Sequence, residues 1–309
     1  MPNPRPSPAG SAPSLLAFPW NDRAGRLSPL KLATFLLLLL PGLYLAGAFY
    51  ADALGAKPIT AAIHDSGKWA VRILLFTLAV SPMRRIADWP RLILVRRMLG
   101  LAVLAYALIH FALYVADQKY DLGAVASEIA LRFYLTIGFA ALVGLLVLGA
   151  TSTDAAVRRL GKRWNRLHQL TYAIAVLGLV HHFLQAKIDV SDPLFAAGVF
   201  LILMGYRAMH RFGIPTRPPA LLALALAAAL ATAGIEAAWY AIKSGVPASL
   251  VLEANLDFSY KLSPAWWVLG IGLLLAVIGF ARGAGRDRRA KPAAPVVRRD
   301  LNPATPART

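Results

Sequence analysis

The stretch RRMLGLAVLAYALIHFALY (residues 96–114) decides the fold class of this chain. Two arginines open it, and an apolar run that contains a single histidine, His110, follows them. An apolar run of about 20 residues is long enough to cross a lipid bilayer as an α-helix. The stretch therefore predicts a transmembrane helix that carries an ionisable side chain into the apolar layer.

Apolar runs of similar length follow one another along the chain and predict an all-α, polytopic membrane helix bundle of about eight spans. Of the 309 residues, 58% are hydrophobic, whereas soluble domains rarely exceed about one half. The mean hydropathy of +0.57 agrees with this class. The predicted spans are residues 31–50, 69–84, 98–116, 130–150, 167–186, 194–210, 219–241 and 264–281.

The formal net charge of +18 would point to nucleic-acid binding in a soluble protein. Here the basic residues gather after every second predicted span, while the intervening loops are nearly neutral. This positive-inside distribution argues against nucleic acid as a partner and predicts that both termini are cytoplasmic. The basic loop residues are Arg84, Arg85, Arg91, Arg96 and Arg97, then Arg158, Arg159, Lys162, Arg163 and Arg166, then Arg207, Arg211 and Arg217.

Four parts are expected along the chain. A Pro-rich cytoplasmic leader (1–30) lacks the apolar core of a cleaved signal peptide and is predicted to be disordered, like the basic cytoplasmic tail (286–309). Between them lie a six-span core (31–212) and an appended two-span hairpin (213–285). No period of about 20–50 residues repeats, which excludes a solenoid. The absence of cysteine excludes disulfides, iron–sulfur clusters and thiolate-ligated haem.

Three histidines lie inside predicted spans, and two of them are expected at the same depth. An ionisable residue within a membrane indicates a functional site, and imidazoles on facing helices can hold haem iron from both sides. His110 lies 12 residues after Met98, which places it about 18 Å from the cytoplasmic end. His181 lies 15 residues after Arg166, or about 22 Å deep. The depths predict His110 and His181 as an axial pair in the outer half of the membrane.

The third histidine, His168, lies about 20 Å below His181, where the third span offers Arg96 and Arg97. Either a second haem there has a different or absent second ligand, or His168 serves another bound group. His182 leaves a further alternative open. On an ideal helix, residue 182 returns to within about 40° of His168, whereas residue 181 lies about 140° away. Helix distortion is common at functional sites, so helix geometry alone does not choose between the neighbours.

Other polar residues of the spans have simpler interpretations. An intramembrane histidine can be a core residue bonded to backbone, although the level pair favours a functional role. His64 and His210 lie at span boundaries, and Glu236 lies near the outer end of the seventh span. Interfacial roles are predicted for these three residues.

Four motifs carry a resemblance to a known family: residues 96–114, TSTDAAVRRLGKRWNRLHQLTY (151–172), LVHHF (179–183) and IHDSGKWA (63–70). Together they resemble the MsrQ family, formerly YedZ, within the ferric-reductase-like transmembrane superfamily. Members are haem-binding membrane subunits of the periplasmic protein-methionine-sulfoxide reductase system. The resemblance runs from about Ala51 to Arg211, a little over half of the chain.

The resemblance implies a six-helix core in the bacterial inner membrane that holds one or two haem b groups. It would pass electrons from the quinone pool to a periplasmic molybdopterin-containing catalytic subunit, which repairs oxidised methionine in envelope proteins. The family's three intramembrane histidines fall on His110, His168 and His181, which are thereby implied as cofactor-binding residues and axial ligands of haem iron. Family members commonly have an aromatic residue at the position of His182, which favours His181 as the ligand.

An FMN is also associated with the family, but the chain shows no flavodoxin-like or Rossmann fingerprint. The phosphate of a bound FMN is expected to meet basic residues at the membrane edge, such as Arg96, Arg97, Arg163 or Arg166. The leader and the C-terminal hairpin depart from the family pattern. These departures leave open whether the hairpin touches the partner, the quinone site or neither.

Two other function classes compete with the electron-transfer subunit. A self-contained transmembrane ferric or cupric reductase normally needs a cytoplasmic NADPH/flavin domain, which this chain lacks. A transporter would show intramembrane acids or broken helices in paired halves. The chain is not expected to be the sulfoxide reductase itself, since it has neither a cysteine nucleophile nor a soluble catalytic domain.

Overall fold

The computed structural model describes residues 18–22, 24–186, 189–259 and 261–290. Within these residues the chain is helical, without a β-sheet, which confirms the predicted all-α class. The elements are α1 (Pro29–Tyr50), α2 (Pro58–Ile86), the 3₁₀ helix η1 (Pro90–Val95), α3 (Arg96–Asp117), α4 (Leu122–Leu131), α5 (Phe133–Ala150), α6 (Asp154–Leu160), α7 (Lys162–His168), α8 (Leu170–Gln185), α9 (Ser191–Arg211), α10 (Pro218–Ser244), α11 (Ala248–Ala254) and α12 (Pro264–Ala290).

Seven helical stretches in the described part of the chain are long and apolar enough to cross a membrane. They contain α1, α3, α5, α7 with α8, α9, α10 and α12. The predicted span 69–84 forms the second half of α2, a 29-residue helix. That helix is long enough to cross, at about 1.5 Å per residue, but it is more polar because its length includes Asp65, Lys68 and Arg72. The multi-pass membrane class is confirmed.

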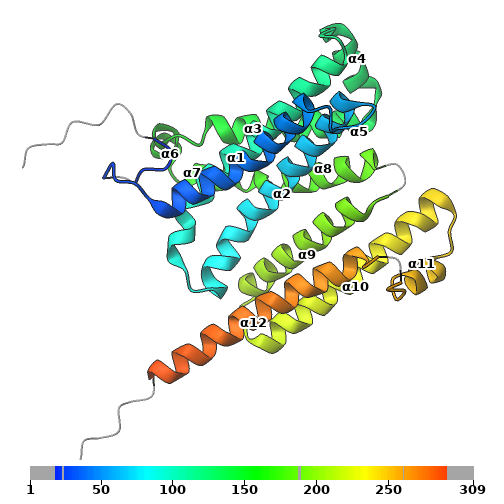
Figure 1. The fold of residues 1–309 in the computed structure, drawn as a ribbon. Helices are drawn as coiled ribbons and strands as arrows, with labels where there is room; N and C mark the ends of the chain where they lie inside the picture. The colour runs from blue at the N-terminus through cyan, green and yellow to red at the C-terminus, as the bar shows by residue number, and fades with distance from the viewer. Residues whose placement is uncertain (1–17, 23, 187–188, 260, 291–309) are drawn as a thin grey trace, which may run out of the picture.

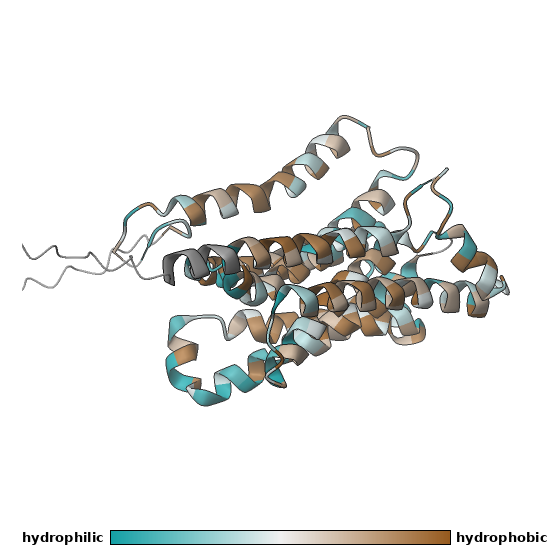
Figure 2. Ribbon diagram, turned by 90° about the horizontal axis from the view of Figure 1, so that it is seen from below, coloured by the Kyte–Doolittle hydropathy of each residue, from teal (hydrophilic) through white to brown (hydrophobic). Residues whose placement is uncertain are grey.

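The long helices run side by side, and the short ones gather at their ends (Figure 1). Helices α4 and α11 lie at one end of the bundle, and α6 and α7 lie at the other. Both ends of the described chain lie at the α6 end. Hydrophobic residues dominate the middle of the long helices and hydrophilic residues their ends (Figure 2). The main core is formed by buried residues of α2, α3, α5, α8 and α9.

Two described helices contain an internal proline, and a side chain from another helix bonds to the backbone near each proline. Pro82 in α2 has no N–H, and the carbonyl of Leu78, four residues earlier, accepts a 2.6 Å bond from Nη2 of Arg207. Near Pro41 in α1, the Tyr106 hydroxyl donates to the Leu38 carbonyl at 2.8 Å. The expected loop residue Arg207 therefore lies inside α9 and stabilises α2.

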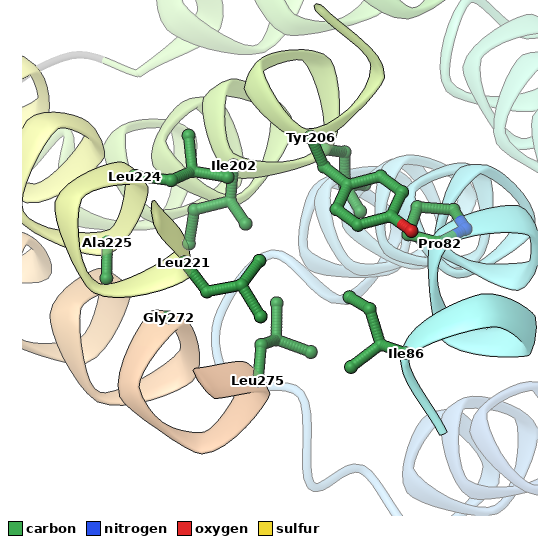
Figure 3. Close-up of a pocket in the computed structure, with 10 residues that line it drawn as sticks. Pro82, Ile86, Ile202, Tyr206, Leu221, Leu224, Ala225, Gly272 and Leu275 are labelled. Carbon is green, nitrogen blue, oxygen red and sulfur yellow. The ribbon is translucent and has the colours of Figure 1, made fainter. Parts of the chain in front are cut away.

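The hairpin α10–α12 packs closely on α9. A Cβ on Gly198 of α9 would stand 2.3 Å from Cγ2 of Val268, and one on Gly272 of α12 would stand 2.3 Å from the Cβ of Ala225. Small residues of this kind let membrane helices approach each other. A small apolar cavity remains where α2 and α9 meet the hairpin, with Tyr206 among its lining residues (Figure 3). None of the histidines lines it.

The α11 end of the hairpin touches the core as well. The rings of Phe183 in α8 and Trp239 in α10 lie 5.3 Å apart. Nζ of Lys261 lies 3.5 Å from a carboxylate oxygen of Asp189, in the loop between α8 and α9. Hydrogen bonds from Ser191 are the main cause that lowers the pKa of Asp189. The hairpin is therefore attached to the core at the end where α8 finishes.

Some predicted boundaries differ from those of the structure. The span predicted at 130–150 begins at Phe133, because Arg132 is extended and separates α5 from α4. Helix α12 continues to Ala290, beyond the predicted start of the tail at Arg286. Residues 18–22 and 24–28 of the predicted leader form turns with an isolated bridge between Asn21 and Leu27. The remaining leader and tail residues, 1–17, 23 and 291–309, lie outside the described part.

Candidate functional site

The structure brings two of the predicted residues together: the imidazoles of His110 in α3 and His181 in α8. Their ring centroids are 6.2 Å apart and their planes are inclined by 82°. Both residues are partly buried. The depth argument expected these two rings at one level, and the structure places them there.

The Nδ1 atom of each imidazole is bonded to the backbone of a neighbouring helix. Nδ1 of His110 lies 2.8 Å from the carbonyl oxygen of Ile63 in α2. Nδ1 of His181 lies 2.8 Å from the carbonyl oxygen of Tyr134, at the start of α5. A carbonyl only accepts hydrogen bonds, so each Nδ1 has to be the protonated donor. Each neutral ring then has its lone pair on Nε2, the nitrogen available to a metal.

The neighbouring residue, His182, faces other groups. Its nearby charges include Asp192 of α9 and Lys68 and Arg72 of α2. Asp192 is ion-paired with both cations, at 3.4 Å and 3.2 Å. Nδ1 of His182 is buried and has no hydrogen-bond partner among the described residues. His182 therefore lies beside a charged cluster rather than opposite His110.

The ideal-helix argument does not apply to this pair of neighbours, because the helix is interrupted. Helix α7 ends at His168 and α8 begins at Leu170. The turn between them has 3₁₀-type bonds from Gln169 N to the Arg166 carbonyl and from Tyr172 N to the Gln169 carbonyl. A rotation of 100° per residue, counted from His168, therefore does not predict which face of α8 His181 or His182 occupies.

The third predicted residue, His168, lies in a different setting. Its ring is stacked on Trp164 with the centroids 3.8 Å apart. Nδ1 lies 3.2 Å from the Trp164 carbonyl oxygen in its own helix, and Nε2 lies 3.4 Å from the Ser152 hydroxyl. Its electrostatic neighbours include Arg96. No second histidine pairs with it in the described part of the chain.

The four arginines considered for an anionic group are not equivalent. Arg97 forms a 2.7 Å ion pair with Asp154. Arg96 has Arg84 and Arg207 as charged neighbours, and no ion pair of Arg96 occurs among the described residues. Arg163 and Arg166 lie in α7. Arg96 thus lies among positive charges without an ion-pair partner in the described part of the chain.

The carboxylate of Glu236 in α10 has a structural partner that the sequence did not indicate. Its Oε2 accepts a 3.0 Å hydrogen bond from Nδ2 of Asn255, which follows α11. The Asn255 carbonyl accepts a 2.8 Å bond from Trp266 of α12. Glu236 therefore helps to fix the segment between α10 and α12.

Comparison with known proteins assigns the chain to a family. Residues 66–179 match the model of the ferric reductase like transmembrane component. This range contains His110 and His168 and ends two residues before His181. The heme-binding subunit MsrQ of the protein-methionine-sulfoxide reductase from Azospira oryzae is 43% identical over 204 residues, which are 63% of this chain and 88% of that protein. The chain belongs to the MsrQ family.

Other MsrQ proteins agree with this assignment. The one from Rhodospirillum rubrum is 42% identical over 60% of this chain and 88% of its own length. One from Xanthomonas oryzae is 42% identical over 52% of this chain and 74% of its own length. Each of these three alignments thus leaves more than a third of this chain uncovered. No solved structure gives a significant match.

Proposed function

We propose that this MsrQ-family chain is the haem b electron-transfer subunit of a methionine-sulfoxide reductase system. The observation that carries the proposal is the pair His110 and His181, with both Nδ1 atoms bonded to backbone carbonyls. The related proteins are named as heme-binding subunits of that reductase. His110 and His181 would be the two axial ligands of the outer haem iron.

The residues present fit such a group. Metal–imidazole bonds of about 2 Å on opposite sides of one ion would place two ring centroids about 6 Å apart. The observed separation is 6.2 Å. The donor set consists of neutral imidazole nitrogens, and a chain without cysteine has no thiolate to offer instead. Such ligands suit an iron that exchanges one electron at a time.

The protein's part in this chemistry is orientation and electrostatics. The carbonyls of Ile63 and Tyr134 fix the direction of the two rings and increase their basicity as ligands. The surrounding apolar helices keep water away, which affects the potential of an iron held between the rings. His168, at the other end of the core, would hold a second haem or another bound group from one side.

We further propose the finer parts of the pathway. Quinol in the membrane would supply the electrons, and a periplasmic molybdopterin-containing catalytic subunit would receive them at the α4 and α11 end. If FMN takes part, its phosphate would bind at the inner end, where Arg96 lacks an ion-pair partner among the described residues. The protein would be a multi-pass protein of the bacterial inner membrane.

The proposed orientation has both termini in the cytoplasm, and reporter fusions test it. Fusions after Arg97, Arg166 and Arg289 should report the cytoplasm, whereas fusions near Asp121 and Leu252 should report the periplasm. The positive-inside distribution is the reason for this expectation. A C-terminal reporter that is active in the periplasm would require an odd number of crossings and would contradict it.

An absorption spectrum of the purified full-length protein tests the main proposal. We expect a reducible b-type haem spectrum with one or two haems per chain. Addition of a quinol should reduce the haem, and addition of the oxidised periplasmic subunit should reoxidise it. A protein without haem would overturn the proposal, and haem that only a ferric or cupric salt reoxidises would favour a metal reductase.

A further inference from the structure

Two glycines lie where helices α2 and α5 meet the imidazoles of the site. A Cβ built on Gly67 would stand 2.9 Å from Nδ1 of His110. One built on Gly138 would stand 2.7 Å from both Nδ1 and Cε1 of His181. Real Cβ atoms essentially never approach other atoms within 3.0 Å. The edge of each imidazole therefore occupies the space that the Cβ of any residue other than glycine would need.

The two contacts repeat one local pattern. Gly67 follows Ile63 by four residues, and Gly138 follows Tyr134 by four residues. Each glycine therefore stands about one helical turn after the carbonyl that accepts the Nδ1–H. Both accepting residues precede their histidine by 47 positions. The pair α2 and α3 and the pair α5 and α8 thus present their histidines in the same way.

Backbone conformation does not explain either glycine. Neither Gly67 nor Gly138 has a positive φ, and within a helix glycine is less favourable than alanine. A third glycine offers a useful comparison. A Cβ on Gly144, also in α5, would stand 2.8 Å from Cγ1 of Ile174 in α8. That contact belongs to the same helix pair, has a similar overlap and involves no imidazole.

We propose that Gly67 and Gly138, the contact glycines, are positioning residues for the two axial ligands. The inference rests on the proposed function. Without a Cβ, each ring edge reaches the helix backbone, so that Nδ1–H meets its carbonyl and Nε2 takes a fixed direction. This contact also holds the two ring planes at their inclination of 82°. A methyl group at either position has to move the ring away from its carbonyl.

Alanine variants of the full-length protein test this role. Because the bonds from Nδ1 orient the ligands, Gly67→Ala and Gly138→Ala should weaken haem retention roughly 10- to 100-fold. The haem that remains should have a shifted midpoint potential. Gly144→Ala is the matched control, since it crowds Ile174 but no imidazole, and it should keep both wild-type values. Equal losses in all three variants, or wild-type values in both contact-glycine variants, would overturn the proposal.

A second measurement uses the wild-type protein and does not depend on how the variants fold. Nearly perpendicular axial imidazoles give ferric haem a highly anisotropic low-spin EPR signal, whereas parallel planes give a rhombic one. We expect the anisotropic signal in the wild type and in Gly144→Ala. A rhombic signal in the wild-type protein would overturn the role of the contact glycines. A wild-type protein that contains no haem would instead overturn the proposed function.

Discussion

The two ends of the core hold their histidines in different ways. At the α4 end, which is the outer end in the proposed orientation, His110 and His181 come from separate helices. The Nδ1–H of His110 bonds to a carbonyl of α2, and that of His181 bonds to a carbonyl at the start of α5. At the inner end, His168 bonds through Nδ1 within its own helix and stacks on Trp164. Its Nε2 lies near the Ser152 hydroxyl.

This difference affects how firmly each end can fix a metal. The outer rings are oriented by contacts between helices, so neither can turn without the loss of a hydrogen bond. The His168 ring has no second histidine opposite it in the described part of the chain, so it could bind a metal on one face only. The Ser152 hydroxyl lies near its Nε2. The outer pair is therefore suited to a six-coordinate iron, whereas the inner histidine needs a second ligand from elsewhere or a different group.

The largest expected effect is the loss of the outer haem. In the proposed site, replacement of His110 or His181 by alanine would remove one of the two axial ligands of the haem iron. Each single variant should lose most of the haem that shows a bis-histidine signal. The haem-to-protein ratio and the EPR spectrum of the purified variants measure this. Full haem retention in both variants would place the ligands elsewhere.

A smaller effect is expected at the inner end. His168→Ala should remove at most a second haem or bound group and leave the outer bis-histidine signal unchanged. The reason is that His168 shares no hydrogen bond with His110 or His181 among the described residues. The haem-to-protein ratio distinguishes one group from two. Loss of the outer signal in His168→Ala would mean that the two ends depend on each other.

The sequence predicted the outer pair because depth along a helix depends only on residue number. A rise of about 1.5 Å per residue put His110 and His181 at one level without any knowledge of packing. Residue spacing could not choose between His181 and His182, because the direction in which each side chain faces depends on the break between α7 and α8. Bends and breaks arise from tertiary contacts, which residue spacing does not record.

The supporting residues were missed for a related reason. The carbonyls of Ile63 and Tyr134 have no side-chain signature, because every residue has such a group. Gly67 and Gly138 did leave a signal, namely glycine inside a helix, but other helical glycines such as Gly178 have open space around them. Only the imidazole that lies against each of them from the neighbouring helix distinguishes the contact glycines from the other helical glycines.

The hairpin provides a test of how independent the outer site is. A chain truncated after Arg217 keeps every candidate ligand, so it should insert and show the same reduced haem spectrum. It should be less heat-stable, because α9 loses its close packing and the Phe183–Trp239 contact alone is worth about 0.5–1.5 kcal/mol. Thermal unfolding followed by haem absorbance measures both effects. Loss of haem at low temperature would show that the redox core includes the hairpin.

If the truncated protein keeps its spectrum but no longer reduces the periplasmic partner, the hairpin belongs to docking or to quinone access. The contacts of Lys261 and Trp239 with the end of α8 favour such a role, since they lie at the outer end of the core. Quinol reduction of the truncated protein separates the two cases. Normal reduction by quinol would leave partner docking as the lost step.

The smallest effect is expected for His182, the residue directly after a proposed ligand. Its buried Nδ1 has no hydrogen-bond partner among the described residues, so His182→Ala breaks no bond that orients His181 and should retain the haem. Loss of the imidazole leaves a void, and His182→Phe is the companion variant because an aromatic ring fills the space. If only the alanine variant loses haem, packing is the cause. If both variants lose haem while His181→Ala retains it, His182 is the ligand, and the agreement between depth, resemblance and ring position at His181 is misleading.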